Sequence, residues 1–139
     1  MFRIKEIDDR VYYVGVNDRN KDRFENLWPL PHGVSYNSYL ITDEKTVLVD
    51  TVDVGFADVF IKKITDVLNG RELDYLIVNH MEPDHGGSIR ILRQYYPNVK
   101  IIGNKKTFGM LEGFHGITTG LQEVKEGDTL SIGSTELVF

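Results

Sequence analysis

The sequence predicts an α/β fold in which strands and helices alternate through the middle of the chain. Residues 73–78 and 99–102 are short apolar runs of the length and composition of buried strands. The stretches 56–69 and 86–96 instead place their apolar residues at helical spacing, on one face. Together they give the order strand, helix, strand, which is typical of a layered α/β domain.

The beginning of the chain is predicted to be rich in β-structure. Residues 11–16 and 36–41 carry β-branched and aromatic side chains, and 42–45 has the composition of a turn into a strand at 46–50. Between the first two strands lies the polar, proline-containing stretch 17–35. Because it shows no regular apolar period, we predict that it forms a long ordered loop or lid.

The helix predicted over residues 56–69 has apolar side chains at spacings of three and four, and Gly70 follows as a stop. The strand at 73–78 is expected to be covered on both faces, since it does not alternate with polar residues. In the second helix, Ile89, Leu92 and Tyr96 share one face, and Pro97 ends it. The apolar positions of the first helix are Phe56, Val59, Phe60, Ile64, Val67 and Leu68.

Everything after residue 102 is predicted to be β-structure, with strands at 121–124, 129–132 and 135–139. The last of these runs to the final residue without a polar tail. This leads to the expectation that the 139 residues are part of a longer domain.

The composition limits the classes of function. The chain has 16 basic and 21 acidic residues, a formal charge of −5, and no run of Lys and Arg. Binding to nucleic acid or to an anionic membrane is therefore not expected. There is no cysteine, which excludes thiolate zinc sites, iron–sulfur clusters and thiol nucleophiles. No apolar run approaches the ~20 residues of a membrane span and no signal-like segment is present, so a cytoplasmic location is predicted.

The strongest chemical signal is the group of metal-binding side chains His80, Glu82, Asp84 and His85. The first three stand at every second position after a buried strand, so an extended path would project them to one side. Pro83 favours that path because it restrains the residue before it. A solvated acidic loop is the alternative, but four donors in six residues indicate a metal site. Imidazole and carboxylate without sulfur suit Zn, Fe or Mn.

The segment from Val78 to Ser88 resembles the ligand loop of flavodiiron proteins, whose metal-binding domain is metallo-β-lactamase-like. Residues 33–41 and 47–52 also look like early strands of that family. The most specific match is Glu82, because hydrolytic relatives of the same fold usually have His there. An anionic ligand in place of a neutral imidazole favours Fe(III).

The resemblance implies an αββα fold, a β-sandwich flanked by helices, of which residues 1–139 would be the N-terminal half. It also implies that His80 and Glu82 ligate one iron of a non-haem di-iron centre, while Asp84 and His85 face the other. The family completes the centre with two further histidines and a bridging aspartate downstream of this sequence. Its flavodoxin-like FMN domain is likewise absent from these residues, so the segment alone would be inactive and would not bind FMN.

The implied activity of the parent protein is reduction of O2 to water or of NO to N2O. An electron donor such as rubredoxin or a flavin reductase, and a homo-oligomeric assembly, are implied with it. Two other functions remain open from the residues alone. A metal-dependent hydrolase of the same fold would use metal-bound hydroxide, and a di-iron O2 sensor would bind O2 without turnover.

Other residues carry weaker signals. His32 and Glu25 lie in the stretch 17–35 and could approach the metal, although solvent-exposed roles are the simpler interpretation. Asp50, at the end of a strand, could orient a ligating imidazole or cap the strand. His115 is expected in a turn or at the surface. Core positions are expected for the aromatic residues Trp28, Tyr36 and Tyr39.

Overall fold

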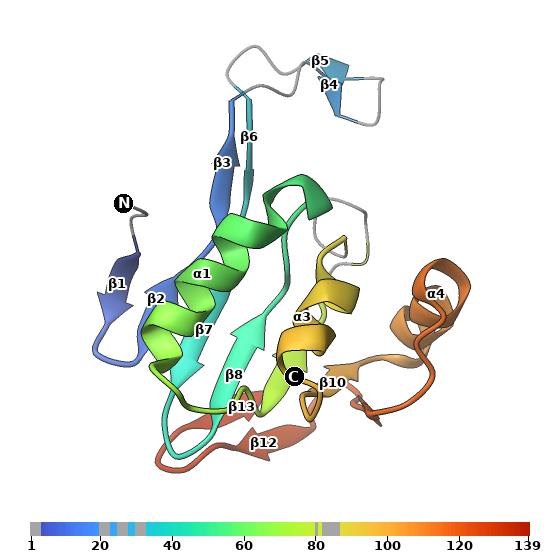
Figure 1. Ribbon diagram of the computed structural model, residues 1–139. Helices are drawn as coiled ribbons and strands as arrows, with labels where there is room; N and C mark the ends of the chain where they lie inside the picture. The colour runs from blue at the N-terminus through green and yellow to red at the C-terminus, as the bar shows by residue number, and fades with distance from the viewer. Residues whose placement is uncertain (1–3, 20–22, 25–27, 30–32, 80, 82–86) are drawn as a thin grey trace.

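The core of the computed structural model in Figure 1 is a seven-stranded mixed sheet. Its strands are β1 (Lys5–Asp8), β2 (Val11–Tyr13), β7 (Tyr39–Thr42), β8 (Thr46–Val49), β9 (Tyr75–Ile77), β10 (Lys100–Gly103) and β11 (Leu121–Glu123). They are ordered β1-β2-β7-β8-β9-β10-β11, antiparallel up to β8 and parallel from β8 to β11. The structure describes residues 4–19, 23–24, 28–29, 33–79, 81 and 87–139.

Helices form the crossovers between the parallel strands, as parallel pairing requires. They are α1 (Ala57–Leu68), preceded by the short 3-10 helix η1 (Val54–Phe56), then α3 (Ile89–Tyr95) and α4 (Lys105–His115). The two predicted helices are confirmed as α1 and α3. Among the described helices, none is long and apolar enough to cross a membrane.

The parallel strands are buried on both faces, and successive residues belong to different hydrophobic clusters because side chains alternate along a strand. On the face covered by α1 and α3, the fully buried strand residues are Leu48, Leu76 and Ile101. On the opposite face they are Val47 and Ile102, and Ile77 beside them is 7% exposed. The prediction that the strand after α1 is covered on both sides is therefore confirmed.

The second face is covered by the antiparallel hairpin of β12 (Thr129–Ser131) and β13 (Glu136–Val138), which contributes Leu130, Ile132 and Leu137 to the second cluster. Asp43, in the turn between β7 and β8, ties the hairpin to the sheet. Its carboxylate accepts hydrogen bonds from the Thr135 backbone N–H at 2.9 Å and from the Ser134 hydroxyl at 3.1 Å. Helices on one face of the sheet and a further pair of strands on the other give the layer order predicted for the N-terminal half of an αββα sandwich.

The stretch predicted as a loop at 17–35 is, where the structure describes it, largely paired backbone. Strands β3 (Val16–Asp18) and β6 (Val34–Tyr36) form an antiparallel ladder, followed by the pair β4 (Arg23–Phe24) and β5 (Trp28–Pro29). This arm rises beyond the end of the sheet where α1 begins (Figure 1). The loop prediction was wrong here because polar residues in these strands hide the alternating pattern.

The base of the arm is joined to α1 by a buried lysine. Lys63 donates a hydrogen bond from Nζ to the Gly15 carbonyl oxygen at 2.6 Å, and burial lowers the pKa of its ammonium group. Gly15 has no room for a side chain, because a Cβ there would collide with the carbonyl oxygen of Tyr36. The arm therefore leaves the sheet at a position that α1 helps to hold.

The prediction of β-structure throughout the chain after residue 102 was wrong for α4. This helix begins at Asn104, whose side chain accepts from the Thr107 N–H at 2.8 Å, and ends at Gly116 in the left-handed conformation, φ 65°. His115 is its last helical residue and is half-buried, rather than part of a turn. Tyr36 is fully buried as predicted, whereas Tyr39 is 36% exposed and is not a core residue.

Protonation of Asp43 is expected to weaken the attachment of the β12–β13 hairpin. The bonds from Thr135, together with those from Glu44 and Ser134, hold the pKa of this carboxyl well below its usual range. A depressed carboxyl pKa contributes stability that is present above the unfolded value of about 4 and is lost as pH falls below it. Urea unfolding at several pH values should therefore show a steeper acid loss in the wild type than in Asp43→Asn. Ser134→Ala keeps the carboxylate and its backbone donors, so it should retain most of the acid dependence; equal slopes in wild type and Asp43→Asn would contradict this role.

Candidate metal centre

The loops that follow β8, β9 and β10 leave the sheet at one edge, because the three strands run parallel. Val49 pairs with Ile77, and Ile77 pairs with Ile102, so the strand ends are level. Asp50 follows β8 and Asn79 lies two residues beyond β9 at this edge. The predicted ligand sequence begins at the next residue, His80, which is outside the described residues.

Asp50 has a left-handed backbone, φ 60°, which is uncommon for a residue other than glycine. Its N–H donates to the Ile77 carbonyl at 2.8 Å, and its carboxylate oxygen Oδ1 accepts from the Asn79 N–H at 2.8 Å. The buried Ser38 hydroxyl donates to the Asp50 carbonyl at 2.8 Å. The sequence left two roles open for Asp50. The structure shows the contact with the Asn79 N–H beyond the end of β9, while the histidines that Asp50 could orient are outside the described residues.

Several described residues within and next to the ligand sequence are buried, although Gly87 is half-buried and Asn79 is exposed. Met81, between two predicted ligands, is 8% exposed and belongs to the main hydrophobic cluster. Ser88 and Ile89, at the start of α3, are fully buried. The Ser88 hydroxyl donates to the Val52 carbonyl at 2.9 Å. The nearest buried residues outside the ligand sequence are therefore Val78 before it and Ser88 after it.

The predicted ligands His80, Glu82, Asp84 and His85 lie outside the described residues, as do His32 and Glu25. Within the part of the chain that the structure describes, no three His, Cys, Asp or Glu side chains gather into a metal-binding group. The donor set therefore still rests on the sequence. What the structure adds is the frame on either side of it.

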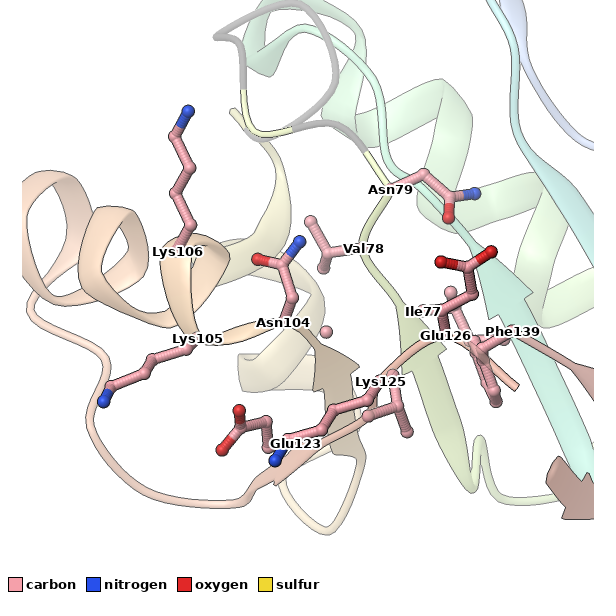
Figure 2. A pocket seen from close by; sticks show the side chains of 12 residues that line it. Ile77, Val78, Asn79, Asn104, Lys105, Lys106, Glu123, Lys125, Glu126 and Phe139 are labelled. Atoms are coloured by element: carbon pink, nitrogen blue, oxygen red, sulfur yellow. The ribbon is translucent and has the colours of Figure 1, made fainter. Parts of the chain in front are cut away.

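A pocket of about 560 Å³ opens beside Asn79, at the carboxyl ends of β9, β10 and β11. Figure 2 shows Asn79 and the Glu126 carboxylate next to each other at one side of it, with Asn104 between the strand ends and α4. Lys105 and Lys106 point away from the middle of the pocket (Figure 2). Their ammonium groups do not converge on a common point (Figure 2).

A second hollow of about 230 Å³ is lined by Met81, Gly87, Phe114 and His115. It joins the end of α4 to the described residues of the ligand segment. Burial, and then the charge of Arg90, lower the pKa of His115, so its neutral form is favoured. No sequence pattern indicated this proximity, because α4 itself was not predicted.

Comparisons with known proteins agree with this architecture. Residues 34–139 match the family model described as ODP family beta lactamase. The flavo-diiron protein FprA2 of Clostridium acetobutylicum is 35% identical over 96% of the chain, and a nitric oxide reductase of Moorella thermoacetica is also 35% identical over 96%. The solved structure of rubredoxin oxygen:oxidoreductase from Desulfovibrio gigas superposes over 98% of the chain with a TM-score of 0.92 and 33% identity.

The chain therefore has a metallo-β-lactamase-like fold and belongs to the ODP family of beta lactamases. Its similarity to flavodiiron proteins extends over nearly all of its length. The chain spans about a third of the length of the relatives it matches, since it covers 34% of each of the three named above.

Removing the helix cap at Asn104 is expected to loosen the wall that α4 provides for both hollows. Asn104→Ala should lower the free energy of unfolding by about 0.5–2 kcal/mol, the usual cost of losing such a cap. Asn104→Asp keeps an acceptor for the Thr107 N–H and should stay close to the wild type. Urea unfolding followed by circular dichroism measures both. An Asn104→Ala protein as stable as the wild type would show that the cap does not stabilise α4.

Proposed function

We propose that this chain supplies four of the ligands of a non-haem di-iron centre in a flavodiiron oxidoreductase. The observation that carries the proposal is the position of the sequence His80 to His85. It follows β9 at the edge where parallel strands end, in a chain whose fold matches rubredoxin oxygen:oxidoreductase at a TM-score of 0.92. His80, Glu82, Asp84 and His85 are the residues proposed to hold metal.

The chemistry of the donor set fits iron. Two imidazoles and two carboxylates without sulfur suit a hard, redox-active ion, and Glu82 adds negative charge where a hydrolytic relative would have a neutral imidazole. When bound, the iron pair would supply the electrons and open coordination positions that O2 or NO reduction requires.

Two contacts of the described residues, the packing of Met81 and the hydrogen bond between Asp50 and Asn79, support this role. Met81 packs into the core, which agrees with an alternating path in which its neighbours in sequence project the other way. Asp50 caps the strand end through the Asn79 N–H. These two contacts join the described residues of the loop region to the core and to the end of β8.

The remaining features of the proposed parent protein come from its relatives. Relatives named as a nitric oxide reductase and a rubredoxin oxygen:oxidoreductase support NO or O2 as substrate. We propose that FMN binds in a part of the protein beyond these residues and delivers electrons from a donor such as rubredoxin or a flavin reductase. A homo-oligomer and a cytoplasmic location remain predictions.

Metal analysis of the protein expressed from its whole reading frame tests the proposal. Iron loaded anaerobically should be retained by the wild type, while His80→Ala and Glu82→Ala should each retain less, because each removes a ligand. Glu126→Gln is the matched control, since Glu126 lies beside Asn79 in the pocket but outside the proposed ligand set. Inductively coupled plasma mass spectrometry gives the iron and zinc content of all four proteins.

Two results would contradict the proposal. One is two zinc ions and no iron together with hydrolytic turnover, which would favour the hydrolase. The other is a stable O2 adduct without turnover, which would favour the sensor.

The 139 residues alone are expected to show no enzymatic O2 consumption with a chemical reductant and free FMN. The proposed centre needs ligands beyond this sequence, because four side chains cannot complete two metal sites of about four ligands each. Oxygen-electrode measurements on the isolated polypeptide check this. Turnover at rates typical of enzymes would overturn the division of the site between this chain and the rest of the protein.

A further inference from the structure

We propose that the segment of residues 50–53, which follows β8, acts as a clamp that fixes both ends of the proposed ligand loop. The two positioning residues are Asp50, within this segment, and Ser88, which is hydrogen-bonded to it. Neither belongs to the proposed ligand set. The inference rests on the proposed function in so far as it concerns metal affinity. Its structural part, that hydrogen bonds made by Asp50 and Ser88 hold residues 79 and 88 against the segment 50–53, is independent of any metal.

The first attachment is at Asp50. A residue other than glycine keeps a left-handed backbone only where its surroundings require it. At Asp50, φ is 60° and the carboxylate accepts a hydrogen bond from the Asn79 N–H at 2.8 Å. The backbone of Asp50 is fixed as well, by its bond to Ile77 and by the Ser38 hydroxyl on its carbonyl. Asp50 thus sets the position of the last described residue before His80.

The second attachment is at Ser88, which is the second described residue after the ligand sequence. Ser88 is the N-cap of α3, where a serine side chain ordinarily accepts a hydrogen bond from its own helix. It makes no such capping bond. Its fully buried hydroxyl instead donates to the Val52 carbonyl at 2.9 Å, with a longer contact to the Asp53 carbonyl at 3.4 Å.

The clamp is itself rigid because it is part of the core. Thr51 and Val52 are fully buried, and Asp53 accepts from the Gly55 N–H at 2.9 Å to begin η1 and α1. Asn79 and Ser88, which lie in the sequence on either side of the loop, are therefore hydrogen-bonded to the same four-residue segment. Fixing both ends reduces the conformational freedom that the loop would lose on binding a metal, and such preorganisation raises affinity.

Two variants remove one attachment each in the protein expressed from its whole reading frame. Asp50→Gly keeps a residue that accepts φ 60° but has no carboxylate, so it tests the hydrogen bond separately from backbone strain. Ser88→Ala removes only the hydroxyl. Asp50→Asn is the conservative variant, because asparagine offers an oxygen acceptor and tolerates the left-handed backbone.

Thr46→Val is the matched control for a lost buried hydroxyl. Thr46 is fully buried at the opposite end of β8, where its hydroxyl donates to the Glu72 carbonyl at 2.7 Å. Its loss should lower the stability of the same strand without changing the ligand loop. A change shared by Thr46→Val and the clamp variants would therefore reflect stability alone.

The first measurement is amide hydrogen exchange of the metal-free proteins by mass spectrometry. Asp50→Gly and Ser88→Ala should exchange faster than the wild type in peptides that cover residues 79–88. Thr46→Val should not, and Asp50→Asn should lie closer to the wild type than Asp50→Gly. The clamp would be overturned if exchange in these peptides were unchanged in both Asp50→Gly and Ser88→Ala. It would also be overturned if Thr46→Val raised exchange there equally.

The second measurement is the dissociation constant for Co²⁺, titrated anaerobically and followed by visible absorption. Removing an outer-sphere positioning group usually weakens metal binding about 10–100-fold, and we expect that range for Asp50→Gly and Ser88→Ala but not for Thr46→Val. Unchanged affinity in the clamp variants would overturn their positioning role. If the wild type binds no Co²⁺, the proposed metal centre and the affinity effect both fail, while hydrogen exchange still decides whether the clamp exists.

Discussion

Parallel pairing of β8, β9 and β10, with both faces of the strands buried, is the constraint on which the other parts of this structure depend. Leu76 and Ile77 lie next to each other in β9 but belong to hydrophobic clusters on opposite faces. A shift of one residue would exchange the two faces, so the register is strongly fixed. Because the register is fixed, the residues that follow the strands always emerge at the same edge.

At that edge lie backbone polar groups that have no hydrogen-bond partner in a neighbouring strand. The Asn79 N–H, the Asp50 carbonyl and the Val52 carbonyl lie just beyond the ladder and are satisfied by side chains of Asp50, Ser38 and Ser88. Buried polar groups without partners are costly, so these three side chains stabilise the edge whatever their effect on a metal. This arrangement requires the left-handed backbone of Asp50, which is energetically unfavourable for a residue other than glycine.

How far the sequence predicted the structure depended on whether the signal was local. The helix α1 was predictable because its apolar residues repeat with the helical period, and Asn69 and Gly70 end it with positive φ. The helix α4 was not, because Gly109 and Gly113 weaken its propensity and few of its residues are apolar. Its best signal was at the ends, in the cap residue Asn104 and in Gly116.

The sequence by itself determined the chemistry of the candidate site and the central elements that carry it. Donor identity is a property of the side chains His80, Glu82, Asp84 and His85, and period-3.6 and apolar-run patterns can be read from neighbouring residues. Only the tertiary structure decided that Asn79 and Ser88 are hydrogen-bonded to the same short segment, residues 50–53, that the β12–β13 hairpin covers the second face, and that His115 lies near Met81. The reason is that these contacts join residues far apart in the chain, and they form only after the parallel strands have fixed where each loop emerges.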